Sequence, residues 1–353
     1  MFASKRPRLS IAAGAAWLLA ILMYASGCSP ADPMSAAGCV DEGRTLNLGF
    51  YAFFAPVSYS ADENPESPGF GDHRGYEADL VTALETMNET NLSFDRYPVA
   101  EWGGIWLKPS ATGYDMAGGG ITILESRTKD ETGSKVVEFT AGHITFRQSL
   151  LVRSEDADRI AAYADLTNEI RVGALPATTG EFRLLQITGL INSDGVLVEG
   201  TQIETPDGIL TADGTADYTI SAGYVSPALR LRSHLHPPAA SMPQIVYLGE
   251  LTGETELLNA LRDGDIDAIA RGEIGNRDAS SISDGTFAVT ALDTAIELGG
   301  FTLSVNDAPL RACIDERIDW LTDSMQIGYA QWREDPSVFM QRARLWNERS
   351  DSF

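Results

Sequence analysis

Short strands and helices alternate along this chain, and this alternation constrains its fold more than any other feature. Strand patterns are expected in two series, at 45–49, 92–97 and 116–123 and then at 149–153, 169–173 and 264–270. Helical patterns begin between them, near residue 75, near residue 102 and after Thr178. This order predicts α/β sheets with right-handed crossovers. A chain of 353 residues is too long for one small core, so the two series predict two lobes.

The N-terminal residues 1–27 have the pattern of an export signal. Lys5, Arg6 and Arg8 precede an apolar stretch at 11–23. This stretch is shorter than the roughly 20 apolar residues that a membrane-spanning helix needs. We therefore expect export from the cytoplasm, with residues 1–27 removed as a signal peptide.

Cys28 closes the export signal after three small residues, in a sequence that resembles a lipobox. Ala25 stands where Leu is more usual in that motif. The resemblance predicts that Cys28 is lipidated and that residues 28–43 tether the protein to a membrane, at the cell surface or in the periplasm. Ordinary signal-peptidase cleavage and an uncleaved anchor are the alternatives.

The charge balance excludes one large class of partner. The chain has 26 Lys and Arg against 50 Asp and Glu, a net charge of −24. Such a surface repels phosphate, so nucleic-acid binding is not expected. The chain has no CxxC motif and its four His are scattered, so no metal site or cofactor is expected either.

Two cysteines remain after the export signal, Cys39 and Cys313. Outside the cytoplasm two leftover thiols tend to pair, so we expect a disulfide between them. Two free thiols are the alternative.

The run 118–127 carries the first candidate binding group. Three glycines lead into an extended stretch with Thr122, and Arg127 follows five residues later. Backbone N–H groups, a hydroxyl and a planar guanidinium can converge on one carboxylate. A surface turn with a solvated arginine is the alternative.

A second candidate anion site lies at the turn 176–181. Thr178 and Glu181 have the spacing of a capping box, and an apolar helix follows. The N-terminus of a helix binds anions readily, which makes Thr178 and Thr179 candidate ligand contacts. Helix capping without any ligand contact is the alternative.

Several blocks in chain order resemble type 2 periplasmic solute-binding proteins, the polar amino-acid receptors of ABC importers (family 3). The blocks are 49–59, 75–80, 114–127, 137–140, 177–181 and 264–268, similar to "G-x-x-x-x-Y-x-P-F", "G-F-D-x-D-L", "G-x-T-x-T-x-x-R", "V-D-F-S", "G-T-T-G-E" and "G-x-x-D-A". The resemblance covers about 44–345, apart from a segment at 201–244 that breaks the pattern. We interpret that segment as an insertion with at most a hairpin and a loop.

The resemblance implies an α/β fold of two lobes that close on a ligand like a clamp, joined by two crossing segments. Lobe 1 would comprise 44–148 and 297–353, and lobe 2 would comprise 149–296.

The resemblance also implies a binding site. Arg127 would hold the α-carboxylate of the ligand with two hydrogen bonds, together with Thr122 and the Gly120 N–H. Thr179, with its own N–H at the helix start, would complete the site from the other lobe. Donors from both lobes favour the closed state only when a ligand bridges them.

Phe54 and Trp102 are the candidate aromatic walls around the side chain of the ligand, with ordinary core packing as the alternative. Tyr51 falls where some members of the family place an acid that binds a basic side chain, which argues against Lys or Arg as the solute.

The contact for an α-ammonium group departs from the family pattern. Gly272 stands where the family has Asp, and Glu273 follows it. Glu273 could replace the missing acid after a small shift. Otherwise Glu273 is a solvated surface residue, and the ligand could be a plain carboxylic acid.

The sequence therefore predicts a binding protein, not an enzyme: a monomer that delivers a small amino-acid-like carboxylate to an ABC permease. One alternative is a cyclohexadienyl dehydratase-like enzyme on the same fold. It would need a general acid, for which Glu101 and Glu273 are conceivable. A receptor that presents ligand to a membrane sensor is the other alternative.

Overall fold

A computed structural model describes residues 38–249 and 253–350. The predicted signal peptide at 1–27, the predicted lipidation site Cys28 and residues 28–37 of the predicted tether lie outside this range. Among the described residues, no helix combines the length and the apolar character needed to cross a membrane.

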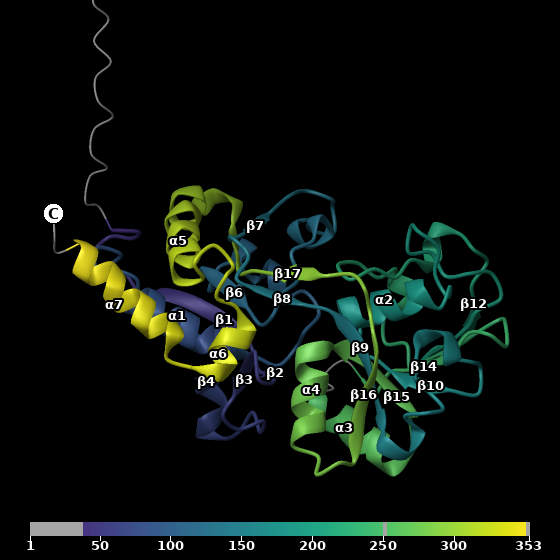
Figure 1. The fold of residues 1–353 in the computed structure, drawn as a ribbon. Coiled ribbons are helices and arrows are strands. Elements are labelled where there is room, and N and C mark those ends of the chain that lie inside the picture. The colour runs from purple at the N-terminus through teal and green to yellow at the C-terminus, as the bar shows by residue number, and fades with distance from the viewer. Residues whose placement is uncertain (1–37, 250–252, 351–353) are drawn as a thin grey trace, which may run out of the picture. The chain divides into compact units, whose positions relative to one another are not determined.

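The first lobe is built on a five-stranded sheet in the order β5-β1-β6-β18-β7 (Figure 1). The strands are β1 (Leu46–Tyr51), β5 (Phe94–Val99), β6 (Met116–Gly118), β7 (Val137–Phe139) and β18 (Thr302–Ser304). β1 is parallel to β5 and β6, whereas β18 is antiparallel to β6 and β7. β18 follows all the strands of the second lobe in the sequence, so the chain returns to the first lobe to complete this sheet.

Helices with apolar faces pack together in the first lobe. They are α1 (Tyr76–Thr86), α5 (Ala308–Leu321), α6 (Tyr329–Glu334) and α7 (Val338–Ser350). Leu80 and Leu84 lie one turn apart on α1, and Ile314 and Ile318 do the same on α5. All four are fully buried in one cluster. Figure 1 shows α7 alongside α1, and the two helices contact each other. The spacing of four residues therefore places one apolar face of each helix in the core.

The second lobe is built on an eight-stranded sheet, β12-β11-β13-β14-β10-β15-β9-β16. Its strands are β9 (Gln148–Arg153), β10 (Arg171–Gly173), β11 (Gln202–Thr205), β12 (Gly208–Thr211), β13 (His234–His236), β14 (Gln244–Val246), β15 (Ala268–Gly272) and β16 (Phe287–Leu292). β10 is parallel to β14 and β15, and β9 is antiparallel to β15 and β16. The part β14-β10-β15-β9-β16 thus repeats the strand pattern of the first lobe.

The segment 201–244 adds more structure than a hairpin and a loop, and that expectation was wrong. β11 and β12 do form a hairpin, but β13 pairs with both β11 and β14. The segment therefore extends the main sheet by three strands. Leu235 of β13 and Ile203 of β11 are fully buried, so the added strands share the core of the lobe. A turn-rich composition hid these strands, because each is only three or four residues long.

Three helices belong to the second lobe: α2 (Thr179–Ile187), α3 (Glu254–Asp263) and α4 (Glu273–Ser281). α3 ends at Gly264, whose φ of 82° is the left-handed conformation that stops a helix. Residue 267 follows three residues later and leads directly into β15. β15 therefore starts close to the end of α3, and its five residues are all buried.

Two strands lie where the chain passes between the lobes. β8 (Ile144–Phe146) comes just before β9, and β17 (Glu297–Gly299) comes just before β18. They pair antiparallel as a separate two-stranded sheet. A small three-stranded sheet of β2 (Phe53–Phe54), β3 (Ser58–Ser60) and β4 (His73–Arg74) follows β1.

Short 3-10 helices occupy several connections: η1 (Pro68–Gly71), η2 (Ile105–Ser110), η3 (Glu125–Thr128), η4 (Ser154–Asp156), η5 (Tyr163–Asp165), η6 (Ala216–Tyr218), η7 (Pro227–Leu229) and η8 (Val305–Asp307). η2 stands where the sequence predicted a helix from residue 102. Its Pro109 lacks the N–H that a regular α-helix would use. The strand expected at 116–123 ends at Gly118, because Gly119 and Gly120 have φ of 137° and 69°.

Cys39 and Cys313 are joined by a disulfide in this structure. Cys39 precedes β1, and Cys313 lies in α5. The bridge spans 274 residues of sequence and ties the start of the first lobe to its late helix.

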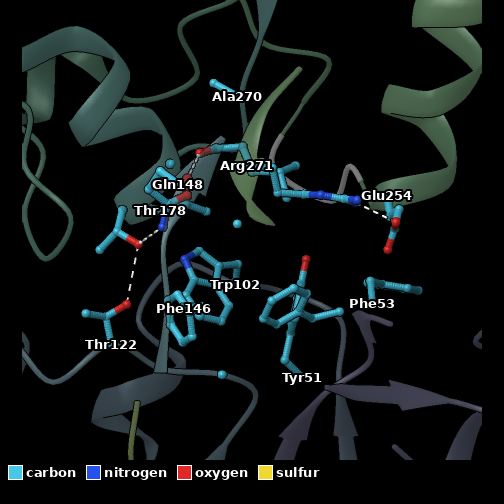
Figure 2. A pocket seen from close by; sticks show the side chains of 16 residues that line it. Tyr51, Phe53, Trp102, Thr122, Phe146, Gln148, Thr178, Glu254, Ala270 and Arg271 are labelled. Carbon is cyan, nitrogen blue, oxygen red and sulfur yellow. Dashed lines mark hydrogen bonds and ion pairs between the residues drawn. The ribbon is translucent and has the colours of Figure 1, made fainter. Parts of the chain in front are cut away.

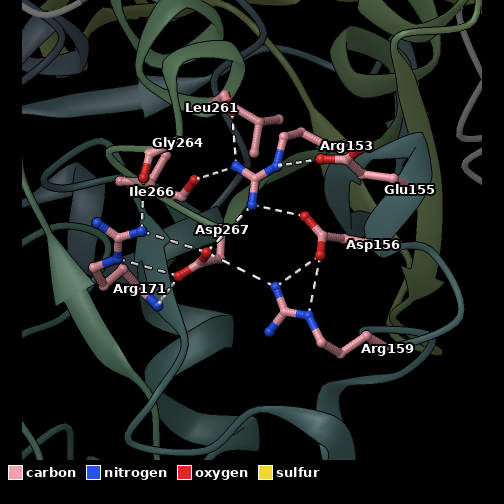
Figure 3. Close-up of polar contacts among 9 residues, drawn as sticks. All are labelled: Arg153, Glu155, Asp156, Arg159, Arg171, Leu261, Gly264, Ile266 and Asp267. Atoms are coloured by element: carbon pink, nitrogen blue, oxygen red, sulfur yellow. Dashed lines mark hydrogen bonds and ion pairs between the residues drawn. The ribbon is translucent and has the colours of Figure 1, made fainter.

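A network of alternating charges lies at the start of β15 in the second lobe (Figure 3). Asp267 lies between three guanidinium groups, 3.3 Å from Arg153, 3.8 Å from Arg159 and 3.2 Å from Arg171. Burial opposes ionisation of Asp267, but hydrogen bonds from the Arg171 backbone and side chain outweigh it and lower the pKa. The Asp of the "G-x-x-D-A" block therefore has a structural use here, since it joins β9, β10 and β15.

Candidate functional site

A cavity of about 570 Å³, including the solvent at its mouth, lies where strands of both lobes end (Figure 2). It is lined by Tyr51, Phe53, Phe54, Trp102, Gly120, Thr122, Phe146, Gln148, Leu175, Thr178, Thr179, Gly180, Glu254, Ala270, Arg271 and Gly272. Tyr51 ends β1, Gly272 ends β15, and residues 120 and 175 follow β6 and β10. Carboxyl ends of parallel strands are the usual place for ligands in α/β sheets. The fold thus brings two such edges to one cavity.

Aromatic rings form one wall of the cavity. Tyr51 and Trp102 meet edge to face with their ring centres 5.0 Å apart. The Trp102 indole N–H donates to the Ala177 carbonyl at 2.9 Å, which links the first lobe to the second. Phe54 of β2 also lines the cavity, and its ring lies against Gly120, where a Cβ would come within 2.5 Å. The aromatic residues singled out from the sequence are therefore brought together here.

A chain of hydrogen bonds forms the polar end of the cavity. Thr122 of the first lobe and Thr179 of the second have their hydroxyl oxygens 3.4 Å apart. The Gln148 amide donates to the Thr179 hydroxyl at 3.0 Å and to a Glu297 oxygen at 2.9 Å. The Thr122 hydroxyl donates to the other Glu297 oxygen at 2.8 Å. Gln148 and Glu297 were not recognised from the sequence, because neither belongs to a motif and both lie at the crossings between lobes.

Arg127 lies beside this polar end but is not among the residues that line the cavity. Its side chain is fully buried, and it donates to three backbone carbonyls: Ala222 at 2.9 Å, Ala177 at 3.1 Å and Thr122 at 3.3 Å. The guanidinium also lies over the Trp106 ring, 4.5 Å from its centre. Burial lowers its pKa to about 9, and nearby Glu297 opposes that shift, so the group stays charged at neutral pH. Arg127 thus holds three chain segments together in this structure.

The Gly120 N–H donates to a carboxylate within its own lobe. Glu77 of α1 is fully buried and accepts from the Gly119 and Gly120 N–H groups at 2.7 and 2.9 Å. The His143 ring lies 3.0 Å from the same carboxylate. Glu77 therefore fixes the glycine turn after β6. The "G-F-D" block, in which Glu77 occupies the acidic position, was the sequence signal for this contact.

The turn before α2 is built as the capping spacing predicts. The Thr178 hydroxyl accepts from the Glu181 N–H at 3.1 Å, while the Glu181 carboxylate accepts from the Ala177 N–H at 2.8 Å. Glu181 is fully buried and is also bound by Arg232 and by the Tyr247 hydroxyl. This support holds Ala177 at its positive φ of 60° and presents Thr178 and Thr179 to the cavity.

The predicted ammonium contact, Glu273, is not part of the cavity lining. It begins α4, and its carboxylate lies 2.5 Å from Arg277 one turn along that helix. The two preceding residues, Arg271 and Gly272, line the cavity instead. The strand ends at Gly272 and a helix begins at Glu273, so sequence spacing alone could not fix the direction of this side chain.

Among the described residues, Arg271 and Glu254 are the charged members of the lining, and no sequence motif pointed to either. An Arg271 nitrogen lies 2.7 Å from a Glu254 oxygen, and each residue is only 8% exposed. Burial raises the pKa of Glu254, against the opposing charge of Arg271. The available signal was an arginine in an otherwise apolar, buried strand. No group of His, Cys, Asp and Glu suited to a metal ion occurs among residues 38–249 and 253–350.

Comparison of the sequence with known protein families and with curated proteins finds no match. Solved structures do match the fold. Holo ArgBP from T. maritima is 17% identical with a TM-score of 0.52, over 80% of this chain and 94% of that one. The amino acid ABC transporter substrate-binding protein AbpA from Streptococcus pneumoniae, bound to L-arginine, is 15% identical with a TM-score of 0.52, over 86% and 95%. The ancestral amino acid-binding protein AncCDT-1, a precursor of cyclohexadienyl dehydratase, is 19% identical with a TM-score of 0.53, over 86% and 95%.

These likenesses and the strand order define the class of fold. The chain has the two-lobed α/β fold of type 2 periplasmic binding proteins. At 15–19% identity the likeness concerns the fold, so the role of the cavity has to be argued from its own residues.

Proposed function

We propose that this protein is an extracytoplasmic solute-binding protein that captures a small amino-acid-like carboxylate between its lobes and passes it to an ABC permease. The observation that carries the proposal is the cavity itself, which is lined by residues of both lobes at the ends of their central strands. A ligand held by both lobes stabilises the closed arrangement, and its release permits opening.

The chemistry of the lining supports a small, partly apolar and charged solute. Aromatic rings of the first lobe face hydroxyl, amide and guanidinium groups that are supplied mainly by the second lobe. A few polar groups in a largely apolar cavity are typical of small-molecule sites. The export pattern at 1–27 and the proposed lipid anchor at Cys28 would place the protein beside a membrane permease. We propose that it acts there as a monomer.

The proposal is tested by thermal unfolding of the purified protein with each of the twenty amino acids and a set of small carboxylic acids. A ligand that binds only the folded protein raises the free energy of unfolding by about 2.7 kcal/mol at 100 times its Kd. The unfolding temperature rises with it. We expect one chemical group of compounds to raise it. If none does at millimolar concentration, the proposed function is wrong.

A dehydratase-like enzyme is the second candidate, since a precursor of cyclohexadienyl dehydratase shares the fold. The acids considered from sequence, Glu101 and Glu273, are not in the lining. Glu254 is in the lining and its raised pKa suits a proton donor. This second function would be favoured if the unaltered protein converted a cyclohexadienyl substrate to product and the Glu254→Gln variant did not.

A further inference from the structure

The end of the cavity opposite Thr122 contains a buried cation with free hydrogen-bonding capacity. Arg271 is 8% exposed and lines the cavity near the end of β15 (Figure 2). Its Nε and Nη2 have no hydrogen-bond partner among the described residues, and Nη1 approaches Glu254 without a well-aligned hydrogen bond. Unpaired buried N–H groups are costly, so a site that leaves them free within the protein favours a ligand that accepts from them.

The surroundings of Arg271 hold its guanidinium closely in place. Gly275 of α4 lies directly against the guanidinium, where a Cβ would come within 3.0 Å of Nη2. Tyr51 lies at the same end of the cavity, and Figure 2 shows its hydroxyl pointing toward Arg271. Burial raises the pKa of Tyr51, so its hydroxyl stays protonated and can donate. This end of the cavity therefore offers several donors to one acceptor group.

The other cationic position near the cavity already has acceptors from the chain. Arg127 donates to three backbone carbonyls, and Thr122 and Gln148 both donate to the Glu297 carboxylate. A ligand carboxylate placed there would have to displace a carboxylate of the protein. Arg271 also has a protein carboxylate beside it, Glu254, but that contact is with Nη1 alone, and Nε and Nη2 have no acceptor among the described residues.

We propose that Arg271 binds the carboxylate of the ligand and Glu254 binds a cationic group of the same molecule, so that the cleft selects a zwitterion such as an α-amino acid. The inference rests on the proposed solute-binding function and identifies its recognition residues. The ligand head then lies against the second lobe, opposite to the placement at Arg127 that the sequence motif implied.

Charge balance explains why the cleft distinguishes a zwitterion from a plain carboxylate. Arg271 and Glu254 form a pair with no net charge, so a zwitterion adds one positive and one negative group and preserves neutrality. A plain carboxylate would add an uncompensated negative charge to a buried site, or would require Glu254 to take up a proton. Both alternatives cost binding free energy.

The first test uses the unaltered protein and isothermal titration calorimetry. L-phenylalanine, L-leucine and L-arginine are each compared with the analogue that lacks the amino group and the analogue that lacks the carboxylate. We expect the amino acid that binds best to lose about 100-fold in affinity in either analogue, as is typical when a buried charge loses its partner. Equal affinity for the deaminated analogue would overturn the inference, while the proposed solute binding would stand.

The second test compares variants with the same amino acid. Arg271→Gln should lose about 100-fold in affinity, and Arg271→Lys should lose less because it keeps the charge but not the planar fork. Arg277→Gln is the matched control, since Arg277 lies on α4 with its side chain 55% exposed and should bind as the unaltered protein does. Unchanged affinity in Arg271→Gln would overturn the inference alone. The proposed function itself fails only if no amino acid and no small carboxylic acid stabilises the unaltered protein in the thermal unfolding test.

Discussion

Two buried arginines lie near the same cavity, and they are used in opposite ways. Arg127 comes from the first lobe and donates to three backbone carbonyls, so its hydrogen bonds are made within the protein. Arg271 comes from the second lobe, lines the cavity and keeps two nitrogens unpaired within the described part of the chain. The comparison shows that a buried arginine in a motif is not by itself a ligand contact. What matters is which acceptors the folded chain already supplies.

The largest expected effect is on stability, at Arg127. Arg127→Met removes three hydrogen bonds to buried carbonyls and leaves a carboxylate, Glu297, without its neighbouring cation. We expect the free energy of unfolding to fall by about 3–5 kcal/mol, as for other broken buried charge contacts. Urea unfolding followed by circular dichroism measures this, with Arg277→Met as the exposed control. A loss of binding without loss of stability would instead restore Arg127 as the carboxylate contact.

The next effect concerns Glu254 and pH. Because burial raises the pKa of Glu254, its carboxylate takes up a proton at a higher pH than an exposed glutamate does. Binding of a cationic group needs the ionised form, so affinity for the amino acid should be highest above this raised pKa. It should fall about tenfold per pH unit below it. Calorimetry at several pH values tests this, and a flat profile would contradict the role of Glu254.

The contribution of Glu254 to the stability of the ligand-free protein has the opposite pH dependence. A carboxyl group with a raised pKa in the folded state binds its proton more tightly there than in the unfolded chain. Its contribution to stability is therefore present below the ordinary glutamate pKa of about 4.3 and is lost as the pH rises through the raised value. Glu254→Gln should remove this dependence in urea unfolding curves.

A smaller effect is expected at Glu297. Glu297→Gln keeps the shape of the side chain but weakens the hydrogen bonds from Thr122 and Gln148 and removes a charge near Arg127. We expect the free energy of unfolding to fall by about 1–2 kcal/mol, the usual cost of losing a hydrogen bond to a charged group. Affinity should change less than in Arg271→Gln. A larger loss of affinity here than at Arg271 would show that the ligand is held mainly at the Arg127 end.

The smallest effect is expected at Gly275. A Cβ there would lie 3.0 Å from Arg271 Nη2 and would displace the guanidinium by a few tenths of an ångström. Gly275→Ala should weaken binding by about threefold to tenfold, since orientation matters at a charge-assisted hydrogen bond. Stability should rise by up to about 1 kcal/mol, because alanine favours a helix more than glycine does. Calorimetry and urea unfolding separate the two effects, and unchanged affinity would show that Arg271 need not be held in this position.

Much of the fold was accessible from the sequence, but less of the candidate site. The order of strands and helices predicted α/β lobes, and the fold is confirmed. Seven of the residues singled out from motifs lie in the lining, where their contact with a ligand stays a prediction: Tyr51, Phe54, Trp102, Gly120, Thr122, Thr178 and Thr179. The motifs identify these positions because they mark the ends of strands, where glycine turns and helix starts recur.

Motifs could not predict the place of four other residues at the cavity: Arg271, Glu254, Gln148 and Glu297. Glu254 begins α3, and Arg271 lies 17 positions later in β15. Neither residue belongs to a motif. Gln148 and Glu297 are 149 residues apart and meet only where the chain passes between the lobes. Such pairs depend on how two lobes are joined, and local patterns carry no information about that.

The sequence by itself determined the alternation of strands and helices, the glycine turn after β6 and the capped start of α2. Each follows from local backbone conformation and from spacing that buries one face. Only the tertiary structure decided that Arg127 donates to carbonyls of the chain, that Glu273 pairs with Arg277 and that Arg271 faces the cavity. The reason is physical: a guanidinium binds whichever acceptors surround it, and those acceptors come from segments far apart in the sequence.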